Sequence, residues 1–113
     1  MPRDARAYLS DIVTSCDAIL EATADMTLAG YLGSRLVRSS VEREFIIIGE
    51  AIAVLGRTAP DVRDSITHAR RIVAFRNQLT HEYQRIDDEA VWVIVQRDVA
   101  VLRSESAGIL ASL

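Results

Sequence analysis

Lysine is absent from this chain of 113 residues: all 13 basic residues are arginine, and there are only one cysteine, two histidines and two prolines. A single cysteine cannot form an internal disulfide, so side-chain packing must hold the fold together. One cysteine and two histidines also cannot supply the four protein ligands of a structural zinc site. Disulfide-dependent and zinc-dependent small folds are therefore excluded.

Long hydrophobic runs are missing as well. The longest apolar stretches, residues 45–48 and 91–95, are far shorter than the roughly 20 residues that cross a bilayer. The N-terminal segment carries an early acid, Asp4, and has no apolar stretch before a cleavage site, so we expect no secretory signal. With 50% hydrophobic residues, the chain is long enough for one core. We expect a single cytoplasmic domain over residues 1–113, with no membrane association.

Charge is unevenly distributed along the chain. The net charge is −3, yet residues 63–85 contain five arginines against two acids. An acidic chain with one basic segment is not a general nucleic-acid coat, but it could hold a phosphate at one site. The planar guanidinium suits phosphate or carboxylate. A solvated helix face is the simpler alternative.

Apolar residues recur at steps of three and four, which predicts an all-α bundle of four to five helices. The run Val-Trp-Val-Ile-Val at 91–95 favours a strand in isolation, but the longer periodicity predicts a helix there. Residues 25–34 should form a connector with room for one helical turn, and Thr58 should cap a further short helix or turn. The predicted long helices cover 3–24, from Ser34 to just before a terminating Gly56, 65–81, and from Asp87 or Asp88 to the C-terminal end.

The second long helix is apolar on more than one side, so part of it could meet another subunit. Its rows are Val41, Phe45, Ile48, Ile52 and Leu55 on one side, with Ile47, Ala51 and Val54 on the other. Gly49 and Ala53 would let a neighbouring helix approach closely, although Gly49 could equally be tolerated without such a role. Cys16 lies on the apolar stripe of the first helix and should be a core residue.

Polar residues of distinct chemistry gather at the predicted end of the third long helix. Asn77 and His81 are four residues apart and share a face, whereas Arg76 and His81 should point about 140° apart. To bring them together, the helix must end or distort near His81, the arginine must wrap round, or a second chain must complete the site. In a purely structural alternative, Arg76 pairs with an acid such as Glu50, His81 caps the helix end and Tyr83 packs with its hydroxyl outward.

The pattern Arg76-x4-His81-x-Tyr83, with Asn77 directly after the arginine, resembles the signature of the HEPN superfamily of α-helical ribonucleases, specifically the HepT-type toxins. The stretch Ile-Ile-Ile-Gly-Glu-Ala at 46–51 and the later Trp92 are similar to that family too. Residues 74–75, Ala-Phe, differ from the glycine and smaller aliphatic residue common there, which affects local packing more than chemistry.

The resemblance implies a metal-independent endoribonuclease without a cofactor, acting as a homodimer or higher homo-oligomer with a composite cleft. His81 would serve as general acid or base, Arg76 would hold the phosphate, and Asn77 would orient RNA or His81. It also implies a toxin–antitoxin system in which a minimal nucleotidyltransferase antitoxin silences the toxin by transferring AMP to Tyr83. Such a bulky phosphate-bearing group beside Arg76 would block RNA.

Two other functions fit parts of the sequence. The chain could be a non-catalytic helical module that binds a nucleotidyltransferase or a nucleotide, with the motif serving phosphate recognition or modification. A plain dimerisation domain would explain the doubly apolar second helix but not the motif residues. Glu50 stays open between a structural ion pair and support for Arg76.

Overall fold

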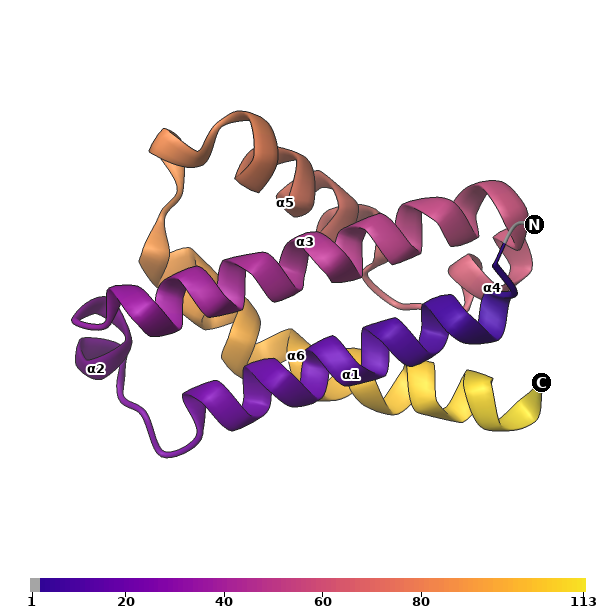
Figure 1. Cartoon of the computed structure of the whole chain (residues 1–113), viewed down its shortest axis with the longest axis horizontal. Coiled ribbons are helices and arrows are strands. Elements are labelled where there is room, and N and C mark those ends of the chain that lie inside the picture. The colour runs from indigo at the N-terminus through magenta and orange to yellow at the C-terminus, as the bar shows by residue number, and fades with distance from the viewer. Residues whose placement is uncertain (1–2) are drawn as a thin grey trace.

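The computed structural model describes residues 3–113, which form six α-helices and one 3-10 helix with no strand (Figure 1). Four of the helices are long, as predicted, and two short ones connect them. The elements are α1 (Ala5–Thr23), α2 (Leu28–Leu32), α3 (Arg35–Thr58), α4 (Pro60–Asp64), α5 (Ala69–His81), η1 (Tyr83–Arg85) and α6 (Asp88–Ser112). The all-α prediction is confirmed.

The core lies between α1, α3 and α6, with α5 packed on α3 on the side away from α1 (Figure 1). The predicted stripe of α1, which includes Cys16, is buried, as is the longer row of α3. The α6 segment 91–95 is helical, so its periodicity outweighs its β-branched composition. Tyr31 of α2 closes one end of the core against Trp92, with ring centroids 5.2 Å apart. None of the described helices is both long and apolar enough to span a membrane.

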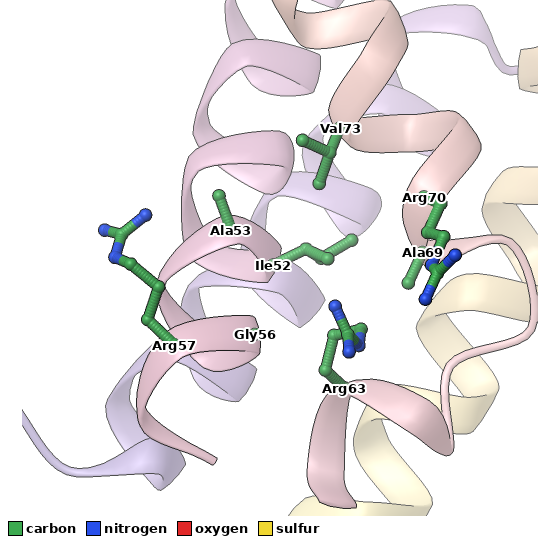
Figure 2. A pocket seen from close by; sticks show the side chains of 8 residues that line it. All are labelled: Ile52, Ala53, Gly56, Arg57, Arg63, Ala69, Arg70 and Val73. Carbon is green, nitrogen blue, oxygen red and sulfur yellow. The ribbon is translucent and has the colours of Figure 1, made fainter. Parts of the chain in front are cut away.

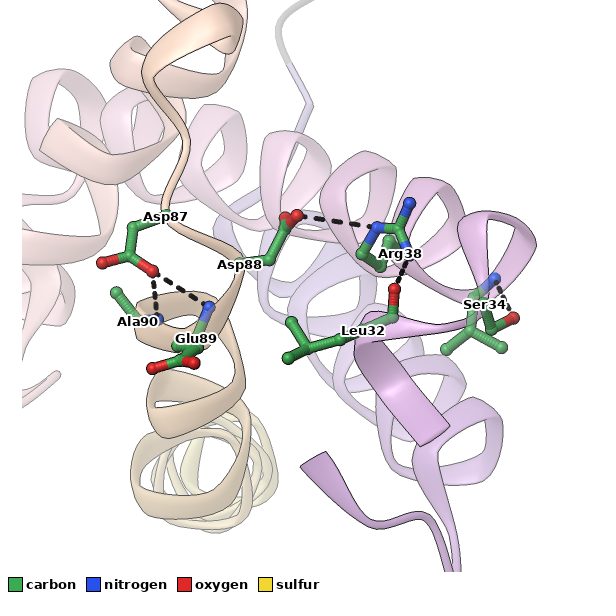
Figure 3. Close-up of polar contacts among 8 residues, drawn as sticks. Leu32, Ser34, Arg38, Asp87, Asp88, Glu89 and Ala90 are labelled. Atoms are coloured by element: carbon green, nitrogen blue, oxygen red, sulfur yellow. Dashed lines mark hydrogen bonds and ion pairs between the residues drawn. The ribbon is translucent and has the colours of Figure 1, made fainter. Parts of the chain in front are cut away.

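Polar side chains begin the helices where the sequence places capping residues. Ser34 accepts a hydrogen bond from the N–H of Val37, and Asp87 accepts from the N–H groups of Glu89 and Ala90 (Figure 3). These bonds satisfy backbone donors that have no partner within the helix. The predicted starts of α3 and α6 are therefore confirmed, and α2 supplies the helical turn expected between residues 25 and 34.

The predicted end of the second long helix at Gly56 is wrong. No glycine among the described residues has a positive φ, and α3 continues through Gly56 to Thr58. The helix ends before Pro60, whose ring disfavours helical backbone at the preceding residue, Ala59. Thr58 does not cap α4 either, because its hydroxyl donates to the carbonyl of Val54 within α3. Pro60 instead opens the short α4 that the sequence predicts at this point.

The third predicted helix begins four residues late, at Ala69 rather than residue 65. Ser65 ends α4, and its hydroxyl donates to the carbonyl of Asp61. Thr67 is held by α6, because its backbone N–H donates to the carboxylate of Glu105 at 3.2 Å and its hydroxyl donates to the same group. Residues 65–68 thus form a non-helical connection that contacts α6, and they are not part of the first turn of α5. The predicted end of this helix at His81 is confirmed.

Candidate active site at the end of α5

Close backbone packing of α5 on α3 determines where the polar end of α5 lies. Gly49 is buried, and a Cβ atom built on it would lie 2.3 Å from Cβ of Arg76 and 2.7 Å from its Cγ. Any larger residue at position 49 would force the two helices apart. Gly49 therefore has the close-approach role that the sequence left open, and the neighbouring helix belongs to the same chain.

The side chain of Arg76 is held at both ends of its guanidinium. Nη2 donates to the carboxylate of Glu50 on α3, and Nη1 donates to Oδ1 of Asn77 at 2.8 Å. Among residues 3–113, its buried Nε has no hydrogen-bond partner. The arginine side chain is 25% exposed and that of Glu50 51%, so the pair sits at the surface rather than in the core. The sequence alternative in which Arg76 pairs with Glu50 is therefore present in the structure. The same contact fixes the orientation of the guanidinium.

His81 and Tyr83 lie beyond Arg76, where the packed part of α5 gives way to solvent. His81 is the last residue of α5 and is exposed, and Tyr83 in η1 is 67% exposed. Among the described residues, neither side chain forms a hydrogen bond or ion pair with Arg76. The helix keeps its α geometry through His81, and Thr80 closes its last turn by donating to the carbonyls of Arg76 and Asn77. One chain therefore does not bring Arg76 and His81 together.

The Phe75 that departs from the HepT-type pattern packs without difficulty. Its ring meets that of Phe45 on α3 edge-on, with centroids 5.2 Å apart. This pair and the buried Leu79 are the main apolar anchors of the C-terminal half of α5. Ala74, next to it, is exposed. The substitution of residues 74–75 thus alters packing against α3 and leaves the polar side chains in place.

A hollow of about 260 Å³ lies beside Tyr83 and contains residues that the motif did not indicate. It is lined by Arg35, Arg38, Ser39 and Glu42 of α3, and by Tyr83, Ile86 and Asp88. Arg38 pairs with Asp88 at 3.6 Å and also donates to the carbonyl of Leu32 (Figure 3). Burial and the neighbouring Asp88 raise the pKa of Glu42. The spacing of Arg35, Arg38 and Glu42 on one helix face was the only available signal in the sequence.

The described residues contain no group of three or more histidine, cysteine or acidic side chains arranged to hold a metal ion. What the end of α5 offers is a positioned guanidinium, a side-chain amide and an exposed imidazole. These groups can bind a phosphate and transfer protons, which are the steps that phosphodiester chemistry requires. The end of α5 is therefore a candidate phosphodiester-binding site in an all-α domain.

Comparison with known proteins identifies the family. The family model described as ribonuclease HepT-like matches residues 12–109, so the chain belongs to the HepT-like ribonuclease family. A Methanocaldococcus jannaschii protein named "Putative RNase MJ1380" is 32% identical over 105 residues, which cover 91% of this chain and 94% of that protein. A Thermococcus cleftensis protein named "Probable ribonuclease HepT" is 27% identical over 105 residues, covering 93% and 94%. No solved structure matches the chain.

Family membership confirms the resemblance drawn from the motif, and with it the class of enzyme, an endoribonuclease. RNA is therefore the substrate class. The particular roles of Arg76, Asn77, His81 and Tyr83 stay predictions, as do the dimer and the antitoxin.

Proposed function

We propose that this protein is the toxin of a toxin–antitoxin system, a metal-independent endoribonuclease of the cytoplasm that uses Arg76 and His81. The observation that carries the proposal is the arrangement of α5, in which Arg76 is held by Glu50 and Asn77 one turn before an exposed His81. Few structural roles require a tethered guanidinium and a free imidazole at the same exposed helix end.

In the proposed reaction the RNA supplies its own nucleophile. His81 takes the proton of a ribose 2′-hydroxyl, the 2′-oxygen bonds to the adjacent phosphorus, and the bond from phosphorus to the 5′-oxygen breaks. The departing 5′-oxygen takes a proton from an imidazolium, which leaves a cyclic 2′,3′-phosphate and a 5′-hydroxyl. Arg76 neutralises the negative charge that builds on the phosphoryl oxygens. Asn77 supports this by holding the guanidinium.

A homodimer would solve the geometric problem of one chain. Arg76 and His81 diverge by about 140° around α5, so a second copy can place its own imidazole across the cleft from Arg76. Two histidines would then share the base and acid steps. The apolar side chains that remain exposed or half-buried on α3 offer area for such contact: Leu36 is 83% exposed, and Ile47 and Val54 are half-buried.

Tyr83 is proposed as the point at which a nucleotidyltransferase antitoxin silences the enzyme. Its exposed hydroxyl would attack the α-phosphorus of ATP, forming a tyrosyl-AMP ester and releasing pyrophosphate. The exposure of Tyr83 and the adjacent Arg35 and Arg38 support this, because they can accommodate the added phosphate. Tyr83→Phe should cleave RNA normally and escape silencing. Unchanged antitoxin control of that variant would contradict the assignment.

The test uses the two histidines of the chain as a matched pair. Parent, His81→Ala and His68→Ala proteins are expressed without a partner, scored for growth arrest, and incubated after purification with total RNA in EDTA. We expect parent and His68→Ala to arrest growth and cleave RNA, and His81→Ala to do neither while keeping the same oligomeric mass. Cleavage by His81→Ala at the parent rate would refute its role. No cleavage by parent protein shown by mass to be unmodified would favour the non-catalytic binding module.

A further inference from the structure

A second arginine-lined hollow lies at the other end of the α3–α5 contact, where α4 joins the two helices (Figure 2). Its volume is about 360 Å³. Arginines from three helices surround an apolar floor, and no acidic residue lines it. The lining consists of Arg57, Arg63 and Arg70 with Ile52, Ala53, Gly56, Ala69 and Val73, which together we call the arginine hollow.

The charges of this hollow are poorly compensated within the described chain. Arg57 and Arg70 are exposed, and neither forms an ion pair or a side-chain hydrogen bond with residues 3–113. Arg63 pairs with Asp64 at 2.9 Å, and Figure 2 shows its guanidinium directed into the hollow, with that of Arg70 reaching toward it from α5. Like charges gathered around a low-dielectric floor create a positive potential that attracts an anion.

Arg63 enters the hollow because a glycine leaves space for it. A Cβ atom on Gly56 would lie 3.1 Å from Nη1 of Arg63, closer than an ordinary contact. Gly56, which does not terminate α3, therefore provides the space that the guanidinium of Arg63 occupies. The arrangement keeps a cation against the α3–α5 seam rather than free in solvent.

One face of α5 carries both an arginine of the arginine hollow and two residues of the proposed catalytic end. Arg70, Asn77 and His81 share one face of that helix, because offsets of seven and eleven residues return to nearly the same direction. On the facing helix, Glu50, Ala53 and Arg57 likewise share a face of α3. The axial distance from Arg70 to Asn77 is about 10.5 Å, which a stacked strand rising about 3.4 Å per nucleotide covers in about three nucleotides.

We propose that the arginine hollow binds a backbone phosphate of the RNA strand, about three nucleotides from the phosphate that is cut. The proposal rests on the ribonuclease function and adds to it an anchoring site remote from the chemistry. Guanidinium groups supply bidentate contacts to phosphate oxygens, and the apolar floor of Ile52, Ala53 and Val73 can pack against a ribose or base. RNA is favoured over a small phosphate because the hollow is open and lies in line with His81.

The test compares two double variants that remove the same charge. Arg57→Gln/Arg70→Gln alters the hollow, and Arg6→Gln/Arg103→Gln alters two exposed arginines that form ion pairs elsewhere on the surface. The probe is a fluorescein-labelled single-stranded 2′-O-methyl RNA oligonucleotide, which lacks the attacking hydroxyl and stays intact. Its affinity for each full-length protein is measured by fluorescence anisotropy over a range of salt concentrations, after circular dichroism has confirmed equal helix content.

We expect the hollow variant to bind the oligonucleotide about tenfold more weakly than the parent at low salt, with the control near the parent value. The slope of log affinity against log salt should fall by roughly 0.7, since the hollow is proposed to hold one phosphate and each phosphate contact in a single strand contributes about that much. Equal affinities and slopes for the two variants would overturn the proposal, as would the absence of binding by the parent. A changed oligomeric mass of the hollow variant with unchanged RNA affinity would also overturn it and assign the face to subunit contact.

Cleavage assays separate this proposal from the catalytic one. The hollow variant should cut a dinucleotide as fast as the parent and a long RNA with a raised KM, because only the long strand reaches the arginine hollow. His81→Ala should instead lose kcat on both substrates. If no variant cleaves RNA, the catalytic proposal fails, whereas the anisotropy comparison still decides the arginine hollow. A reduced rate on the dinucleotide would place Arg57 and Arg70 in the catalytic machinery and contradict the anchoring role.

Discussion

The bundle of α1, α3 and α6 and the helix α5 differ in how many of their side chains are buried. The bundle of α1, α3 and α6 contains most of the buried side chains, whereas α5 buries only Ala69, Ile72 and Leu79 of its 13 residues. The start of α5 is tied to α6 through Arg71 and the neighbouring Thr67, while its end contacts α3 through Phe75 and Arg76. Stability is concentrated in the bundle, and the polar chemistry lies on the least covered helix.

Core truncations in the two halves give the largest expected contrast. Ile48→Ala removes a fully buried side chain of the core and should lower the free energy of unfolding by about 2–5 kcal/mol. Leu79→Ala on α5 should cost less, because solvent and neighbouring side chains can fill the space at the helix end. Urea unfolding of both variants measures the difference. Equal losses would show that α5 is as integral to the core as α3.

The α3–α5 seam can be broken at a single position. Gly49→Ala should lower stability by about 1–3 kcal/mol and abolish RNA cleavage, since the new methyl group overlaps Arg76 and displaces the helix that carries His81. Gly108→Ala on α6 is the matched control, because nothing lies within 4 Å of its added Cβ. That variant should gain up to about 1 kcal/mol from better helix propensity and keep full activity. Thermal unfolding and RNA cleavage by Gly49→Ala at the control levels would contradict the role of the close approach.

Acid stability should depend on Asp98 of α6, which pairs with Arg97 of its own helix and with Arg71 of α5. Asp98 is buried, and its hydrogen bonds from Arg97 lower its pKa, with His68 and Arg71 reinforcing the effect. A depressed folded-state pKa contributes stability that is present above the unfolded-state value near ~3.9 and is lost as pH falls through the folded-state pKa. Asp98→Asn should therefore lose about 1–3 kcal/mol at neutral pH and show a flatter decline below about pH 4. If denaturant titrations show the same loss of stability at low pH in Asp98→Asn as in the parent, Asp98 is not the source of that loss.

The smallest expected effect on stability is at Glu50. Because its carboxylate is half exposed, Glu50→Gln should change the free energy of unfolding by less than about 1 kcal/mol. The glutamine oxygen can still accept from Arg76, but a phosphate no longer competes with a negative charge for the guanidinium. We expect RNA affinity to rise about two- to fivefold, measured with the 2′-O-methyl oligonucleotide. Weaker binding would mean that the charge of Glu50 is needed to position Arg76.

Much of the fold follows from local patterns in the sequence. The periodicity of α1 and α6 and the caps Ser34 and Asp87 act within one or two turns, so they can be identified without tertiary information. The errors at Gly56 and at residues 65–68 have a different origin. At Gly56 the helix continues until Pro60 ends it, and the glycine accommodates Arg63 of the next helix instead of capping α3. At Thr67 a contact distant in sequence decides the structure, because Glu105 of α6 binds this residue.

The candidate site divides in the same way. The polar cluster and its resemblance to the HepT-type motif selected Arg76, Asn77, His81 and Tyr83 as candidates, and helix periodicity predicted the divergence of Arg76 from His81. It did not identify the arginine hollow or the residues around Tyr83, because their members come from separate helices and form no linear motif. Gly49 is an intermediate case, since the sequence indicated that a helix could approach closely there but did not indicate which helix.

The buried Cys16 allows transient unfolding of the protein to be measured by the reactivity of its thiol. Burial raises the pKa of its thiol to about 12, so almost no reactive thiolate exists at neutral pH while α1 stays packed. A thiol-alkylating reagent would then modify only molecules that have opened, and the rate of modification would count those openings. Because a ligand that binds only the folded state suppresses opening by a factor set by its concentration over its Kd, this single thiol can register RNA binding without any attached label.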